Sequence, residues 1–71
     1  MKTINGYARM IGHKVCVTWE TGHFTFYSPD EFDQLPANVI AAINTKGEYD
    51  GELPRCLYEA AMLAELMPLL R

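Results

Sequence analysis

The sequence predicts one α+β domain, in which a three-stranded antiparallel β-meander is followed by two or three helices packed on one sheet face. Two observations predict it. Residues up to 28 are rich in β-branched and aromatic types that alternate in polarity, and helix start and stop signals follow. The chain has 71 residues and shows no repeat or linker, so residues 1–71 are expected to form a single domain.

The first two strands are expected at about residues 4–11 and 14–20. Gly12-His13 would form the turn between them. This register places Gly6 opposite Trp19, and a glycine at that position gives the large indole room. The hairpin therefore predicts that one face of the ribbon is apolar.

The third strand is expected at about residues 23–28, and its register depends on the length of the preceding turn. A two-residue turn at 21–22 places Val17 opposite Phe26, whereas a three-residue turn would place Val17 opposite Thr25. We favour the shorter turn because it gathers the large apolar residues on one face. That core face is Ile4, Ala8, Met10, Val15, Val17, Trp19, Phe24 and Phe26. The outward face is Tyr7, Arg9, Ile11, Cys16, Thr18, Glu20, His23, Thr25 and Tyr27.

Helices are expected at about residues 29–35, 36–45 and 53–67. Ser28 followed by a proline and two acidic residues is typical of a helix N-terminus. Pro36 should keep the first helix short, and Gly47 should end the second. The glycine-bracketed, charged stretch after Gly47 is expected to be a loop.

Composition indicates a folded cytoplasmic protein without a metal or cofactor. Apolar residues make up 49% of the chain, which is too many for a disordered segment. No apolar run has the length of a signal peptide or a membrane span. The two cysteines, Cys16 and Cys56, are too few for a secreted disulfide scaffold, so we expect free thiols. No cysteine or histidine spacing suits a metal ion.

Nothing in the residue pattern predicts an enzyme. Ser28, the single serine, is explained by its place at a helix start. Glu20 and His23 should be cross-strand neighbours, which predicts a surface charge pair and leaves an acid–base pair in a small ligand-binding domain as the alternative. Cys16 and Cys56 would need an electropositive setting to be reactive.

The net charge of −3 is concentrated in the middle of the chain and predicts the first candidate binding surface. Carboxylates from two separate segments could meet as one acidic patch that either keeps the protein soluble or occupies the basic groove of a partner. These residues are Asp30, Glu31, Asp33, Glu48, Asp50 and Glu52.

Two further surfaces are candidates for binding. Tyr7, Arg9 and Tyr27 on the outward sheet face combine residue types that anchor interfaces, and they are our second choice. The last helix is apolar around most of its circumference, which favours a homodimer. The dimer face would comprise Met62, Leu66 and Leu69.

In its general character the chain resembles the small phage-encoded orphan proteins of the anti-CRISPR inhibitor type. The likeness rests on a short chain beginning at Met1, on acidic stretches at 30–33 and 48–50, and on the lack of a catalytic motif. It implies a non-enzymatic inhibitor in the host cytoplasm. Such a protein would dock on a nucleic-acid-handling complex, its carboxylates standing in for DNA phosphates.

Two other functions stay open: a homodimeric structural or regulatory subunit, and the small ligand-binding domain. Direct DNA binding through Arg9 and Lys14 is disfavoured by the acidic net charge.

Overall fold

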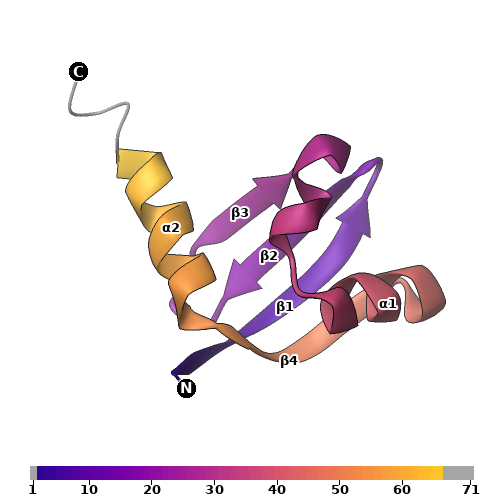
Figure 1. Ribbon diagram of the computed structural model, residues 1–71, viewed down its shortest axis with the longest axis horizontal. Helices are drawn as coiled ribbons and strands as arrows, with labels where there is room; N and C mark the ends of the chain where they lie inside the picture. Colours follow the sequence, from indigo (N-terminus) through magenta and orange to yellow (C-terminus); the bar gives the residue numbers. More distant parts are fainter. Residues whose placement is uncertain (1, 67–71) are drawn as a thin grey trace.

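The protein folds as a four-stranded antiparallel sheet with its helices on one face (Figure 1). The computed structural model describes residues 2–66, and the side chains of residues 2–64. The strands are β1 (Thr3–Ile11), β2 (Lys14–Trp19), β3 (Phe24–Tyr27) and β4 (Glu48–Pro54). The helices are the 3₁₀ helix η1 (Pro29–Gln34), α1 (Ala37–Lys46) and α2 (Arg55–Leu66). The α+β class is confirmed, with one more strand than expected.

The first hairpin has the predicted register. Gly6 lies opposite Trp19, and Gly12 has the positive φ of 65° that its tight turn requires. A Cβ on Gly6 would lie 2.7 Å from Leu53 Cδ1 and 3.4 Å from Trp19 Cε3. Only glycine therefore fits between these two buried side chains without a shift.

The predicted register of the second hairpin is wrong by one residue. Val17 lies opposite Thr25 because the turn has three residues. The Trp19 N–H donates to the His23 carbonyl at 2.9 Å, and Gly22 takes the left-handed position with φ of 95°. The shift turns every side chain of β3 over. Phe24 and Phe26, expected in the core, are 61% and 56% exposed, whereas Tyr27, expected outside, is 4% exposed.

The segment predicted as a loop after Gly47 forms β4, an edge strand paired antiparallel to β1. Its residues alternate: Tyr49 and Leu53 face the helices, and Leu53 is fully buried. The charged residues that alternate with these were expected in a loop, but they lie on the side of the strand that faces solvent. Those residues are Glu48, Asp50 and Glu52.

The helices begin and end near the predicted residues. η1 is short because Leu35, before Pro36, is extended, and Gly47 ends α1 with φ of 85°. α2 begins at Arg55, two residues later than expected, because the preceding pair belongs to β4. None of the described helices is long and apolar enough to span a membrane.

The core lies between the sheet and the helices. Its largest fully buried side chains are Trp19, Leu53, Val15, Val17 and Val39. The Trp19 indole N–H donates to the Thr25 hydroxyl at 2.8 Å, and the Tyr58 ring of α2 meets the indole edge-on at a centroid distance of 5.2 Å. Met10, expected in the core, is exposed near the end of its hairpin.

Candidate protein-binding surface

The outer face of the sheet, opposite the helices, is open across the described residues. The η1, α1 and α2 helices all pack on the other face (Figure 1). Because the strands are antiparallel and in register, outward side chains form rows across the sheet. One row runs Phe26, Cys16, Arg9 and Glu48, and the next runs Phe24, Thr18, Tyr7 and Asp50.

One side of this face is acidic. Glu48, Asp50 and Glu52 project from β4 as a line of carboxylates, which we call the β4 strip. The Tyr7 hydroxyl donates to Glu48 at 2.7 Å, and the Thr3 hydroxyl donates to Glu52. The bond to Glu48 raises the pKa of Tyr7, because the neutral phenol is the donor. The strip is therefore tied to its neighbouring strand by hydrogen bonds.

Arg9 lies between the acidic and aromatic sides of the face. It is exposed, and it stands opposite Glu48 on β4 and Cys16 on β2. Tyr7 and Arg9, which the sequence placed together on the outward face, thus share that face with the three carboxylates of the β4 strip.

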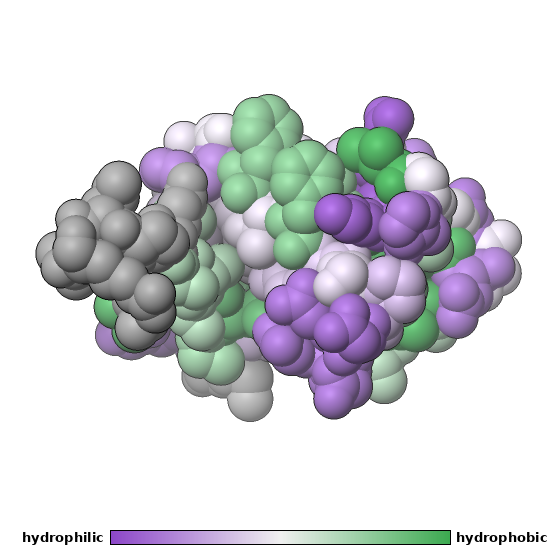
Figure 2. All heavy atoms as spheres, turned by 90° about the horizontal axis from the view of Figure 1, so that it is seen from above, coloured by the Kyte–Doolittle hydropathy of each residue, from purple (hydrophilic) through white to green (hydrophobic). Residues whose placement is uncertain are grey.

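The other side of the face is apolar. Phe24 and Phe26 project outward from β3, and both are more than half exposed. Apolar side chains stand out beside hydrophilic ones on the surface seen in Figure 2. Two adjacent exposed phenylalanines are uncommon on a surface that only meets water, and aromatic residues are enriched at interfaces. The sequence already contained a signal for them, since Gly22 suits the left-handed position of a three-residue turn.

The remaining predicted carboxylates do not join the β4 strip. Asp30, Glu31 and Asp33 lie on η1, which contacts β2 and β3 on the helix side. β3 and β4 are opposite edges of the sheet, about 14 Å apart at the usual strand spacing. The two acidic segments are thus separated by the width of the sheet and lie on different faces.

Glu31 is used locally to cap η1. Its carboxylate accepts hydrogen bonds from the Ser28 hydroxyl at 2.7 Å and from the Ser28 backbone N–H at 3.1 Å. These bonds, the hydroxyl's first, lower the pKa of Glu31. The structure thus places Ser28 at the helix start that the sequence predicts.

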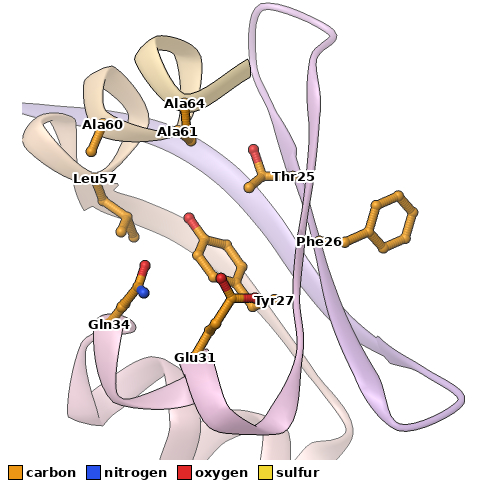
Figure 3. Close-up of a pocket in the computed structure, with 9 residues that line it drawn as sticks. All are labelled: Thr25, Phe26, Tyr27, Glu31, Gln34, Leu57, Ala60, Ala61 and Ala64. Carbon is orange, nitrogen blue, oxygen red and sulfur yellow. The ribbon is translucent and has the colours of Figure 1, made fainter. Parts of the chain in front are cut away.

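Tyr27 lies apart from Tyr7 and Arg9, on the helix side. It borders a cavity of about 170 Å³ between β3, η1 and α2, with Phe26 turned the other way (Figure 3). Burial, and to a lesser degree the charge of Glu31, raises the pKa of Tyr27 to about 12. Its hydroxyl has no hydrogen-bond partner among the described residues.

Glu20 and His23 bond to different partners because of the register shift. The Glu20 carboxylate accepts the Asn5 N–H at 2.8 Å, and His23 Nδ1 lies 3.0 Å from the Thr21 hydroxyl.

Both cysteines are free thiols, Cys16 buried and Cys56 exposed. No group of three potential metal ligands occurs among the side chains that the structure describes.

The predicted dimer face on α2 is described only in part. Met62 is half-buried and packs against the core, while Leu63, one position further, is exposed. The Leu66 side chain and Leu69 lie outside the described residues.

Comparison of the chain with protein-family models, with curated proteins and with solved structures found no match.

Proposed function

We propose that this protein is a non-enzymatic inhibitor or adaptor that binds a basic protein partner through its outer sheet face. One observation carries the proposal: an open face on which two strands, β1 and β2, separate the β4 strip from the exposed Phe24 and Phe26. The strip would attract lysines and arginines of the partner, and the phenylalanines would enter an apolar depression. Tyr7 and Arg9 would contribute directional contacts between the two.

The charge balance of the face favours a basic partner. The β4 strip contributes three carboxylates and the exposed Glu20, which accepts the Asn5 N–H of β1, contributes a fourth, against Arg9 and Lys14. Such an excess raises the rate of encounter with a positive surface and disfavours nucleic acid as a direct ligand.

The narrower form of the proposal is an anti-CRISPR inhibitor that occupies a nucleic-acid-binding surface of an effector complex. Mimicry of DNA phosphates would then fall to the β4 strip alone, because the η1 carboxylates lie on the other side. The aromatic pair would supply contacts that a DNA backbone lacks.

The test compares charge reversals on the two sides of the molecule. Glu48→Lys/Asp50→Lys alters the β4 strip, and the control Asp30→Lys/Asp33→Lys makes the same charge change on η1. The wild-type protein is used to capture partners from a host lysate, and binding of the purified partner to each variant is then measured at low and high salt.

We expect the β4 variant to weaken binding at least about tenfold, with the wild-type affinity falling as salt rises, because the attraction is electrostatic. The η1 variant should bind like the wild type. Binding that depends on η1 but not on β4, or that ignores salt, would contradict the proposal.

A further inference from the structure

The β3 strand presents unpaired backbone groups at the edge of the sheet. Trp19 and His23 form a hydrogen-bonded pair, so the alternation of an antiparallel ladder turns the backbone groups of Thr25 toward β2 as well. The N–H and C=O groups of Phe24 and Phe26 therefore point away from the sheet. No strand of the described residues pairs with them.

This edge lacks the protection that the opposite edge has. Edge strands usually avoid pairing with other chains by carrying charges, proline or a bulge. Residues 24–27 contain none of the charged types and no proline, whereas β4 carries three carboxylates. A β4–β4 contact between copies would set these carboxylates against one another, so only the β3 edge is open to pairing.

We propose that β3 pairs antiparallel with β3 of a second copy of this chain, so that one sheet continues through both copies. A two-fold axis at Thr25 would place Phe24 opposite Phe26 of the second copy. Both of these residues have edge-facing N–H and C=O groups, so this register pairs all of those groups. It also sets exposed aromatic side chains against each other across the strands.

The helix side of the edge has room for the added strand. A cavity of about 170 Å³ lies between β3 and α2, and the side chains that α2 presents there include three alanines (Figure 3). Thr25 borders this cavity, and Thr25 of the second copy would face the same space. Small side chains on α2 therefore leave the edge accessible where a larger residue would block it.

A second copy suits this edge better than an unrelated strand. The Phe-Thr-Phe sequence is self-complementary about its threonine, and a 71-residue chain gains stability from association. The inference does not rest on the proposed function. It would join two outer faces into one surface, with aromatic residues at the centre and a β4 strip on each side.

The first test measures the oligomeric state together with the hydrogen exchange of the amides at the β3 edge. Sedimentation of the wild-type chain from about 1 µM to about 1 mM should show a monomer–dimer equilibrium. Over the same range, hydrogen exchange of the Phe24 and Phe26 amides should slow as the dimer forms. A monomer at every concentration would overturn the proposal, and so would a dimer in which these two amides exchange as fast as in the monomer.

The second test uses matched variants. Phe24→Lys removes one ring from each aromatic pair and sets the two new lysines diagonally across the two-fold axis, and Ile11→Lys places a lysine on the outer face away from β3. Far-UV circular dichroism confirms that each variant folds. Phe24→Lys should weaken dimerisation at least about tenfold and Ile11→Lys should not, whereas equal weakening by both would mean that the copies pack face to face. Charge reversal on β4 should leave the dimer intact, so this proposal and the proposed function fail separately.

Discussion

At the scale of single residues, Tyr27 combines burial with an unused polar group. Its ring fills the space between β3 and the helices, but its hydroxyl has no hydrogen-bond partner in the described part of the chain. A buried hydroxyl without a partner loses its hydration and gains nothing in return. The same burial raises the pKa of Tyr27 to about 12.

We therefore expect Tyr27→Phe to leave the free energy of unfolding unchanged at pH 7 or to raise it by about 1 kcal/mol. At high pH the free energies of unfolding of the wild type and of Tyr27→Phe should differ more than at pH 7. An unfolded tyrosine loses its proton near pH 10 but the folded one near 12, so wild-type stability falls as pH rises through this window. Urea unfolding followed by Trp19 fluorescence from pH 7 to 11.5 measures both effects. Parallel pH profiles for the two proteins would contradict the assignment.

Gly6 is a residue whose position could be predicted from the sequence. Its place opposite Trp19 followed from one short turn, and the structure confirms both the register and the close approach. Tyr27 could not be placed in the same way. Its side of the strand depended on whether the turn before it had two residues or three, and one residue of slip reverses a strand.

At the scale of elements, the stability of η1 depends on the hydrogen bonds at its N-terminus. Six residues make too little helix to persist by propensity alone, and Ser28 and Glu31 hold the first turn through two hydrogen bonds. η1 in turn lies over β2 and β3, so its loss would loosen that part of the core.

Ser28→Ala should lower the free energy of unfolding at pH 7, because it removes the hydrogen bond from the Ser28 hydroxyl to Glu31. The deficit should shrink in acid. Ser28 lowers the pKa of Glu31, so the stability from this bond is present above the ordinary pKa of a glutamate and is lost as pH falls through the folded value. Thermal unfolding of both proteins from pH 7 to 3 measures the difference. A deficit that stays constant with pH would mean that Glu31 takes no part in the cap.

The elements themselves were predictable to different degrees. Helix boundaries followed from prolines and Gly47, which act locally through backbone geometry. β4 could not be predicted, because its outward residues are all charged and Gly51 interrupts the inward ones, and a strand of this kind forms only when a partner strand is available. That partner, β1, is distant in the sequence, since its paired residues are 39 positions apart at Arg9 and Glu48 and 51 positions apart at Thr3 and Pro54.

At the scale of the whole molecule, topology decides which charges act together. The six candidate carboxylates come from two segments that were expected to meet as one patch, yet three lie on η1 on the helix side of the sheet and three on the edge strand β4. Sequence could identify the residue types of the candidate surface. It could not identify which of them share a face, because that requires the fourth strand and the register of the third.

The last helix joins the domain through a few apolar side chains, one of which makes an aromatic contact with Trp19. Leu57, Tyr58 and Met62 of α2 pack on the core, and the Tyr58 ring meets Trp19 at the end of β2. The Tyr58 hydroxyl adds only a long bond of 3.3 Å to the Thr21 hydroxyl. Ring packing, rather than hydrogen bonding, should therefore decide whether helix and sheet unfold together.

Tyr58→Ala should lower the free energy of unfolding by about 2 kcal/mol, somewhat less than for a fully buried aromatic ring because Tyr58 is only partly buried. It should also shift Trp19 emission to longer wavelength in the folded state, since the indole is only 1% exposed beneath this contact. The matched variant Tyr58→Phe keeps the ring and should stay within about 0.5 kcal/mol of the wild type. Helix content and Trp19 fluorescence should report one transition in the wild type and two in Tyr58→Ala, because α2 would detach before the sheet unfolds. A single shared transition in Tyr58→Ala would show that α2 is held by contacts other than this ring.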